Sequence, residues 1–393
     1  MPLNKHRKLS PVLSLAALIL LLVLLIILEQ HQSSNRMAVA VLQKGAILAV
    51  AAVAMNLPNG FTGIFSLGMA GFMSIGAYIT AILTIPTDTI ESVYYISGVA
   101  GWVMNLKRAL DVLPQPLLVL VALLIGGLIA ALFAFLIGIP VLRFKSDYLA
   151  IATLGFSEII RALVASPQLD RVTNGSYGLK NIPGFATASG SGVLLIPFAI
   201  AAVCIFIMIL VINSSYGRAF KAIREDDIAA EAMGINLLKH KELSFVISSF
   251  FTAISGGMLA MYMRSIDSKT FQVALTYDIL LIVVIGGMGS VTGSIISAFL
   301  ITAAKEWWLR FFDQTLYIGN WQVPLLRTGF RMVVFSILLM VVVLFYRRGL
   351  MGDREFSWED ILGLPQRWRH RRVAIAAAKA EAAAPKDGGQ NDA

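Results

Sequence analysis

The stretch LLVLVALLIGGLIAALFAFLIGI, residues 117–139, contains no charged side chain. A helix needs about 20 predominantly apolar residues to cross the hydrocarbon core of a bilayer, which is about 30 Å thick. The stretch exceeds that length without an interruption by Asp, Glu, Lys or Arg. It therefore predicts a helix that spans a membrane.

The composition extends this prediction to the whole chain. Of its 393 residues, 58% are hydrophobic and only 14% are charged, which is far more apolar than a soluble domain. Similar apolar runs recur from end to end, and we place spans at residues 12–28, 38–56, 61–85, 117–139, 148–164, 193–212, 243–263, 277–287, 294–309 and 328–346. The predicted fold class is an all-α polytopic membrane protein with about ten transmembrane helices, some of them broken or re-entrant.

Lys and Arg residues gather in a few segments outside the apolar runs. They lie at the N-terminus, in the turn at 143–145, in the stretch 217–235, and from residue 347 through RWRHRR at 367–372. The positive-inside rule places such segments in the cytoplasm. Both termini are therefore expected inside, and the chain then crosses the membrane an even number of times.

Three regions follow from these assignments. Residues 1–11 form a cytoplasmic N-terminus, 12–346 a transmembrane domain with a cytoplasmic segment at 214–242, and 347–393 a basic, low-complexity cytoplasmic tail. The first apolar run follows basic residues, which is also typical of a signal peptide. It lacks a convincing small-residue cleavage site, so we interpret it as a retained helix.

Two glycine-rich segments interrupt the apolar pattern, NGFTGIFSLGMAGFMSIGAY at 59–78 and GGMGSVTG at 286–293. Glycine weakens a helix, and backbone groups freed at membrane depth must be covered by neighbouring helices or line a polar cavity. Interrupted helices in both halves of a membrane protein indicate a pathway near the midplane. The alternative is that these glycines only let helices pack closely, as in the small-xxx-small pattern of Gly289 and Gly293.

The sequence offers little for enzymatic chemistry. No histidine pair has metal-ligand spacing within a span, no serine lies in a nucleophile elbow, and there is no G-x-x-x-x-G-K-[ST] loop. We therefore expect no catalytic residue, no metal and no cofactor on this chain.

Lys44, Glu158, Arg161 and Asp278 are ionisable residues within or at the spans. Each is either functional, because charge in a bilayer is costly, or a paired or snorkelling side chain.

The stretch GRAFKAIREDDIAAEAMGI, residues 217–235, carries charges of both signs between two apolar runs. Asp226 and Asp227 are residues that cap a helix, the alanines favour helix, and Gly234 supplies a C-terminal stop. We predict one small cytoplasmic helix, from about residue 219 to 233, whose slim alanine face fits a partner's groove. The alternative is an ordinary solvated loop helix.

The same stretch resembles the coupling-helix, or EAA, segment in permease subunits of bacterial ABC importers, specifically the branched-chain amino acid permeases of the LivM type. Further stretches resemble this family in the same order: FTGIFSLGMAGFMSIGAY at 61–78, SDYLAIATLGFSEIIR at 146–161, TNGSYGL at 173–179 and LIVVIGGMGSVTGSIISAFL at 281–300. The resemblance covers roughly 38–346. Where many relatives have a histidine this chain has Met69, and its tail after Arg348 is longer than the family ending.

The resemblance implies a membrane-spanning permease subunit of an ATP-driven importer for leucine, isoleucine and valine in a bacterial cytoplasmic (inner) membrane. It implies as partners a second homologous permease subunit, two ABC ATPase subunits, an extracytoplasmic substrate-binding protein and the lipid bilayer, and no nucleic acid. ATPase motion would be coupled to alternating access. The alternatives are a urea or short-chain amide permease of the same family and, from another class, an ion-coupled secondary carrier or a non-transporting membrane scaffold.

Candidate site residues follow from the resemblance together with the chemistry of the cargo. The ammonium and carboxylate of an amino acid are costly in hydrocarbon, so a pathway needs small hydroxyls or backbone polar groups. The ATPase-coupling candidates are Gly217, Arg218, Arg224, Glu225, Asp226, Ala230, Glu231 and Gly234. The substrate-pathway candidates are Ser66, Gly68, Thr153, Ser157, Gly286, Gly287 and Gly289. The candidates for docking a binding protein, in the polar loop at 171–184, are Thr173, Asn174, Gly175 and Gly178.

Overall fold

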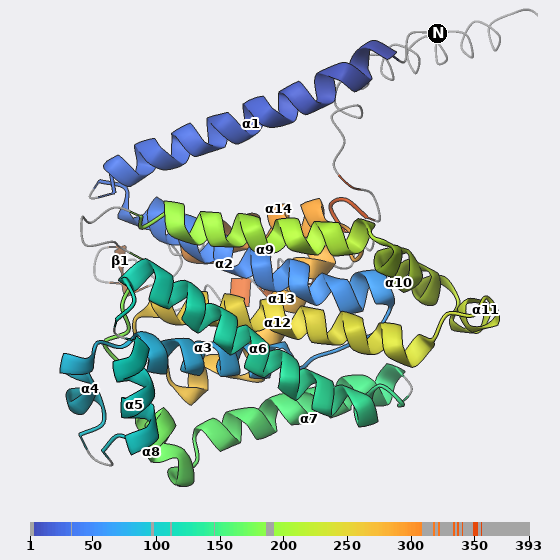
Figure 1. Cartoon of the computed structure of the whole chain (residues 1–393). Helices are drawn as coiled ribbons and strands as arrows, with labels where there is room; N and C mark the ends of the chain where they lie inside the picture. Colours follow the sequence, from blue (N-terminus) through green and yellow to red (C-terminus); the bar gives the residue numbers. More distant parts are fainter. Residues whose placement is uncertain are drawn as a thin grey trace, which may run out of the picture. The chain divides into compact units, whose positions relative to one another are not determined.

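The computed structural model describes residues 4–32, 34–95, 98–110, 112–144, 146–185, 192–308, 317–318, 321–322, 333–334, 336–337, 340, 349–352 and 355. The chain divides into two compact units, Leu25–Glu355 on one hand and Met1–Leu24 with Phe356–Ala393 on the other. The described part of the latter unit is the beginning of helix α1 (Asn4–Gln30), which contains the span predicted at 12–28. The other elements lie in Leu25–Glu355 (Figure 1).

Among the described residues, four helices are long and apolar enough to cross a membrane. They are α2 (Arg36–Asn56) with its continuation η1 (Leu57–Thr62), α6 (Gln115–Val141), α9 (Leu195–Asn213) and α12 (Leu237–Met263). A fifth span results if Tyr148–Val164 and Pro167–Thr173, which are bent by 55°, count as one. The predicted all-α polytopic class is confirmed, and four of the predicted spans match these long helices closely.

The remaining elements are shorter, except α7 (Ser146–Val164), which has 19 residues like α9. The helices are α3 (Met69–Thr84), α4 (Thr87–Val93), α5 (Gly101–Leu110), α7, η2 (Pro167–Leu169), α8 (Asp170–Thr173), η3 (Gly175–Tyr177), α10 (Ser215–Glu225), α11 (Asp227–Ala232), η4 (Ser268–Phe271), α13 (Val273–Gly286) and α14 (Val291–Glu306). Two short strands, β1 (Tyr317–Ile318) and β2 (Trp321–Gln322), pair antiparallel. The span predicted at 328–346 lies almost entirely outside the described residues, as does most of the tail at 347–393.

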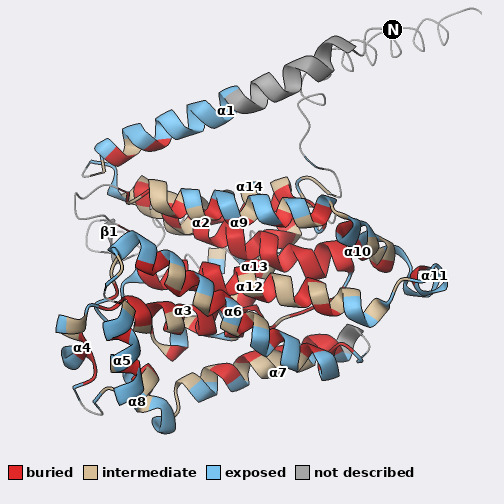
Figure 2. Cartoon of the chain, in the orientation of Figure 1, coloured by how far each residue is buried: buried red, intermediate tan, exposed pale blue. Residues whose placement is uncertain are grey.

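Helices α3 and α12 form the centre of the unit Leu25–Glu355 and are buried along most of their length (Figure 2). Their backbones touch, because a Cβ at Gly76 would lie 1.9 Å from the Ala253 carbonyl oxygen and one at Gly256 would lie 2.1 Å from that of Met73. No side chain fits at either glycine. Two serine hydroxyls of α12 also donate to carbonyl oxygens of α2. Close packing through small residues, which is typical of membrane helices, therefore explains these glycines.

The first predicted break is present, but it lies differently from the prediction. α2 continues as the π-helix η1, Gly63 then adopts a left-handed φ of +76°, and the chain is not helical again until Met69. The predicted span at 61–85 is therefore wrong at its start, since residues 61–62 belong to the preceding helix and 63–68 to a linker. The linker is stable because other helices satisfy its backbone: Thr153 of α7 accepts the amide N–H of Leu67 (3.0 Å).

The second predicted break is the turn of a helical hairpin. α13 and α14 run antiparallel, with Ser297 Oγ donating to the Ile282 carbonyl (2.6 Å) and the backbones of Gly286 and Gly293 in contact. At 1.5 Å per residue the two helices are about 21 and 24 Å long, which is shorter than the hydrocarbon core. They begin at residues 273 and 291 rather than at the predicted 277 and 294, and the Ser290 side chain caps α14.

Candidate coupling and pathway site

The segment predicted as one coupling helix folds into two, α10 and α11, so the prediction of a single helix from about 219 to 233 is wrong. Asp226 makes the break. Its backbone is extended (φ −159°, ψ 112°), and its Oδ1 accepts the amide N–H groups of Ile228 (2.9 Å) and Ala229 (3.0 Å). An aspartate that bonds the backbone locally favours a helix start over a helix interior. The predicted cap is therefore present and causes the break.

Gly234 ends α11 as predicted. Its φ of +84° lies in the left-handed region that favours glycine. Its amide N–H donates to the Glu231 carbonyl (2.9 Å), and that of Ile235 donates to the Ala230 carbonyl (3.1 Å). These two bonds form a Schellman ending, which satisfies carbonyls that a helix end leaves open.

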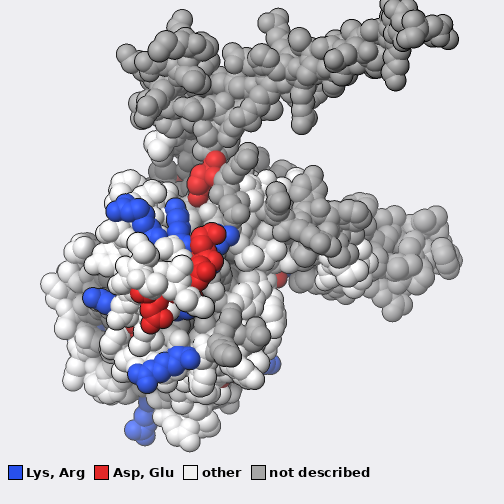
Figure 3. Space-filling model, turned by 90° about the vertical axis from the view of Figure 1, so that its right-hand side faces the viewer, with Lys and Arg blue, Asp and Glu red and all other residues white. Residues whose placement is uncertain are grey.

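The outer face of the two helices is accessible. Of the coupling candidates, Gly217 and Ala230 are buried, Arg224 is half-buried, and Arg218, Glu225, Asp226, Glu231 and Gly234 are exposed. Ile228 and Met233 are 81% and 83% exposed, so α11 presents apolar side chains among charges. Acidic and basic side chains gather together at this end (Figure 3). The sequence prediction missed Ile228 and Met233, although apolar residues in so polar a stretch were an available signal.

α10 packs directly against the first break. A Cβ built on Gly63 would lie 3.3 Å from the Cα of Arg224. The Lys221 ammonium lies 5.6 Å from the centroid of the Phe61 ring, which is within the range of a cation–π interaction. A pair of hydroxyls 2.7 Å apart joins η1 to α12 on another side. A displacement of α10 therefore reaches η1 without an intervening element.

Asn56 joins the two breaks. Its side-chain Nδ2 donates to the Ser290 carbonyl and to Ser294 Oγ, both at 2.9 Å, while its Oδ1 accepts the amide N–H of Gly289 (2.8 Å). The side chain is fully buried at the end of α2. The sequence prediction ended a span at this residue without giving it a role. An amide in an apolar run was the only signal, and it does not reveal its partners 233 residues or more away.

Four pathway candidates meet at the first break. The amide N–H of Ser66 donates to Asn59 Oδ1 (3.1 Å). The amide N–H of Leu67 donates to Thr153 Oγ1 (3.0 Å). Gly68, Thr153 and Ser157 line a crevice too narrow for a water molecule. Among the described residues the buried Ser157 hydroxyl has no hydrogen-bond partner. Asn59 and Thr153 thus satisfy backbone groups of the linker at Ser66 and Leu67, whereas Ser157 keeps unused hydrogen-bonding capacity.

The other three candidates, Gly286, Gly287 and Gly289, lie at the second break and do not line that crevice. Gly287 and Gly289 have φ values of +112° and +97°. The chain after the last predicted span packs on this turn, since a Cβ at Gly287 would lie 2.5 Å from the Gly352 carbonyl oxygen. The structure therefore gives these glycines a role in turn geometry, and it does not bring them into one site with the other candidates.

Three further hydroxyls were not singled out in the sequence. Ser74, Tyr78 and Thr80 lie on α3, and their buried side-chain oxygens have no hydrogen-bond partner among the described residues. Most buried polar groups in proteins are paired, so these hydroxyls keep hydrogen-bonding capacity that the described residues do not use. The same holds for the Ser157 hydroxyl and for Oε1 of Glu242 on α12.

The binding-protein candidates hold a turn instead of facing outward. Thr173, Asn174, Gly175 and Gly178 are all buried, and Asn174 in a left-handed conformation donates from Nδ2 to the carbonyls of Val93 (3.1 Å) and Gly178 (2.7 Å). The exposed residues of this region include Ser176, Lys180 and the paired rings of Tyr177 and Tyr95. The predicted residues therefore hold the backbone of the turn, and neighbouring side chains form its exposed surface.

This turn lies far from α10 and α11. Leu179 pairs with Ile266, just beyond the end of α12, whereas α11 precedes the start of the same helix. A helix of 27 residues is about 40 Å long. The turn and the coupling segment are thus separated by more than the thickness of a hydrocarbon core.

The charges noted within the spans are paired. Glu158 and Arg161 form the expected i,i+3 pair at 2.7 Å, Asp278 lies 2.7 Å from Lys305, and Lys44 lies 2.5 Å from Glu306 of α14. Each pair is partly exposed, so it contributes little to stability by itself. No group of three or more His, Cys, Asp or Glu side chains that could hold a metal ion occurs among the described residues.

Comparison with known proteins identifies the family. Residues 37–347 match the family described as "Branched-chain amino acid transport system / permease component". The chain is 31% identical over 300 residues to the "High-affinity branched-chain amino acid transport system permease protein LivM" of Escherichia coli K12, and 30% identical to the protein of the same name in Salmonella typhimurium LT2. Each alignment covers 69% of this chain and 64% of the relative, so the chain matches slightly less than two-thirds of their length.

A third relative is more distant but matches over more of its length. The "Probable branched-chain amino acid transport permease protein LivM" of Methanocaldococcus jannaschii is 23% identical over 78% of this chain and 90% of its own. No solved structure matches the chain. The family match covers more than half of the chain, including both breaks and the coupling segment. The chain belongs to the branched-chain amino acid transport system permease family, as a LivM-type permease.

Proposed function

We propose that this chain is the membrane-spanning subunit of an ATP-driven importer for branched-chain amino acids, and that α10 and α11 couple it to ATPase subunits on other chains. The observation that carries the proposal is the contact between α10 and the first break, where Gly63 faces Arg224 and Phe61 faces Lys221. A docking element that rests on an unwound stretch of a membrane helix is placed to move that stretch. The names of the relatives support the substrate class.

The motion starts at the exposed tip. Ile228 of α11 and Met233, which directly follows the helix, insert in a groove of the ATPase, with the surrounding charges at the rim. Closure of the ATPase pair then pushes α10 against η1 and the linker after it. Asn56 transmits the displacement to Gly289 and the second break. Contiguous packed contacts of this kind carry coupling between distant sites when the linked elements have two arrangements.

The partners occupy opposite ends of the spans. Two ABC ATPase subunits bind on the cytoplasmic side at α11, and a second, homologous permease subunit completes the pathway in a bacterial inner membrane. An extracytoplasmic binding protein contacts the turn that presents Ser176, Tyr177 and Tyr95. Both termini, with the basic tail at 347–393, lie in the cytoplasm by the positive-inside rule.

The cargo is an apolar side chain attached to a zwitterion. Its charged groups need polar partners at every depth, and the unpaired hydroxyls of Ser157, Ser74 and Tyr78 supply hydrogen bonds without a fixed charge. A site of this type suits a net-neutral molecule. Urea and short amides are also neutral, so the neutral site does not distinguish them from leucine. An uptake measurement does.

The experiment uses a bacterial strain that lacks this gene and is complemented with the gene and its partner genes. We expect energy-dependent uptake of labelled leucine, competed by isoleucine and valine but not by urea. Replacement of the P-loop lysine of the partner ATPase should abolish this uptake, which separates an ATP-driven importer from an ion-coupled carrier. Leucine uptake that survives an inactive ATPase, or uptake of urea alone, contradicts the proposal.

A further inference from the structure

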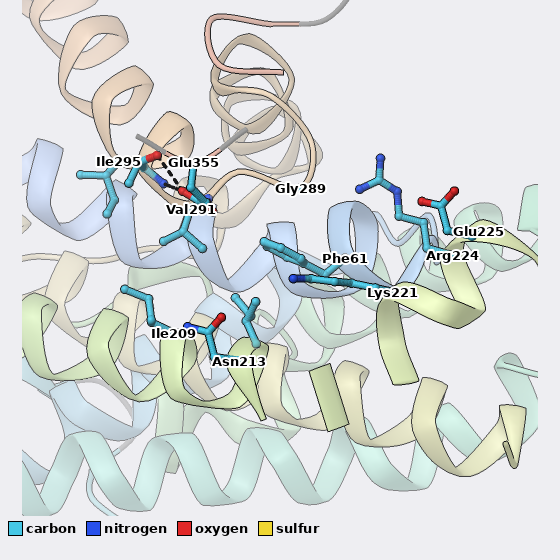
Figure 4. A pocket seen from close by; sticks show the side chains of 12 residues that line it. Phe61, Ile209, Asn213, Lys221, Arg224, Glu225, Gly289, Val291, Ile295 and Glu355 are labelled. Carbon is cyan, nitrogen blue, oxygen red and sulfur yellow. Dashed lines mark hydrogen bonds between the residues drawn. The ribbon is translucent and has the colours of Figure 1, made fainter. Parts of the chain in front are cut away.

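A cavity of about 500 Å³ lies between the coupling segment and the two breaks. Its walls come from α9, η1, α10 and the start of α14, and Glu355 lies at one side (Figure 4). Cavities of 300–1,000 Å³ are the usual size of small-molecule sites. The proposed pathway candidates other than Gly289 do not line it, so it is distinct from the crevice at Ser157.

One part of the wall is apolar and built from branched or aromatic side chains. Ile209 of α9 lies opposite Val291 and Ile295 of α14, with Phe61 of η1 beside them (Figure 4). Ile212 of α9 also lines this part. A wall of this kind holds an aliphatic group of a few carbon atoms by removing it from water. It offers nothing to a purely polar ligand.

The other part of the wall carries charges of both signs. Lys221 and Arg224 contribute two cations, and Glu225 and Glu355 contribute two carboxylates, so the lining has no net charge. The Glu355 carboxylate already occupies the N-terminus of α14, where it accepts the amide N–H groups of Val291 (2.7 Å) and Thr292 (3.0 Å). A phosphate-bearing ligand would face both carboxylates and would find the helix terminus taken.

We infer that this cavity binds an apolar α-amino acid in its zwitterionic form from the cytoplasmic side. The carboxylate of the ligand lies toward Lys221, its ammonium toward Glu225, and its aliphatic side chain against Ile209 and Ile295. A charge-balanced, two-sided lining matches a molecule that is itself neutral overall, carries both charges and has one apolar group. A ligand there wedges between α10 and η1 and holds the two against relative movement.

The inference rests on the proposed function, because that function places the cavity at the cytoplasmic end. It adds a regulatory consequence: accumulated product binds the importer from inside and slows its turnover. A ligand that binds only one of two states shifts their ratio by about tenfold at a concentration about ten times its dissociation constant. For a ligand as small as leucine we expect half-maximal effect at about 1 mM.

The test uses the complete importer in inside-out proteoliposomes, with the binding protein and leucine in the lumen and ATP outside. Leucine is then added outside, where it meets only the cytoplasmic face. We expect external leucine to reduce ATP hydrolysis by roughly threefold or more at several millimolar, whereas glutamate and lysine have little effect. An ATPase rate that is unchanged by leucine in this range overturns the inference.

Two matched variants locate the effect. Ile295→Trp fills the cavity, whereas Ile296→Trp places the same side chain on the next, exposed position of α14. We expect Ile295→Trp to lower ATP hydrolysis in the absence of external leucine, because the indole takes the place of the ligand between α10 and η1, and to remove any further response to leucine. Ile296→Trp should behave as wild type. Equal inhibition of both variants places product binding elsewhere and refutes this site. Absence of ATP hydrolysis and uptake in the wild-type complex would instead contradict the proposed function itself.

Discussion

Replacement of Gly234 by valine tests whether the end of α11 matters for coupling. The glycine has a φ of +84°, and a Cβ built on it meets no atom within 4 Å. The substitution therefore introduces backbone strain without a steric clash. A β-branched residue in the left-handed region costs about 1–2 kcal/mol, which corresponds to a roughly fivefold to thirtyfold loss in the population of the native helix end.

Such a loss is large for α11 because the helix has six residues and little stability of its own. Two of its terminal hydrogen bonds, from Gly234 to Glu231 and from Ile235 to Ala230, depend on the left-handed residue. When they open, the exposed Met233 no longer has a fixed position. The membrane spans are stabilised elsewhere, so insertion and expression should be normal.

The assay compares ligand-stimulated ATP hydrolysis and leucine uptake by the reconstituted importer at equal permease content. We expect Gly234→Val to lose most of both activities. Gly234→Asn is the matched control, because asparagine also adds a side chain but tolerates the left-handed conformation. It should retain most of the activity. Wild-type uptake by Gly234→Val would refute the reasoning and leave the segment a solvated loop.

Three further predictions concern the fold and the topology. Asn56→Ala removes three buried hydrogen bonds and leaves the amide N–H of Gly289 without its acceptor, so we expect a loss of about 2–4 kcal/mol in stability. The loss is read as a lower thermal unfolding temperature of the purified permease, and an unchanged temperature contradicts the link between the breaks. Gly76→Ala should cost about 1–3 kcal/mol because its Cβ would lie 1.9 Å from a carbonyl oxygen, whereas Gly155→Ala, with no atom within 4 Å, should leave stability unchanged or slightly raised. An impermeant thiol reagent should label Ser176→Cys only from outside the cell and Met233→Cys only from inside, and the reverse pattern would overturn the topology.

Much of the fold could be predicted because it depends on local rules. The apolar run at 117–139 became a helix over Gln115–Val141, since burial in lipid and intrahelical hydrogen bonding both act along the continuous run. The cap at Asp226 and the stop at Gly234 were also predictable, because each depends on one residue and its neighbours within a few positions. Where a feature is local, one sequence carries enough information to place it.

The features that were missed depend on contacts between distant residues. The start of α3 at Met69 requires Thr153 of α7 to accept a backbone N–H of the linker, and no local pattern shows that this partner exists. Asn56 likewise depends on distant partners, because its side chain bonds to Ser290 and Gly289 of the second break. The docking candidates at Thr173 and Asn174 were chosen as polar turn residues, yet polar side chains in turns often serve the backbone. Polarity alone therefore did not separate residues that hold a surface from residues that present it.

The arrangement of the two breaks also explains why a transport pathway would place its compliant elements there. Bending an intact helix stretches a series of i→i−4 hydrogen bonds, whereas residues 63–68 are joined to the protein by separate bonds to Asn59 and Thr153. A small displacement of α10 can therefore shift the linker while α2 and α3 keep their internal bonding. Asn56 ties the end of α2, where η1 begins, to the second break, because its amide would lose three hydrogen bonds if the two moved apart. The same contacts that stabilise an interrupted backbone in the membrane thus also define which parts of it must move together.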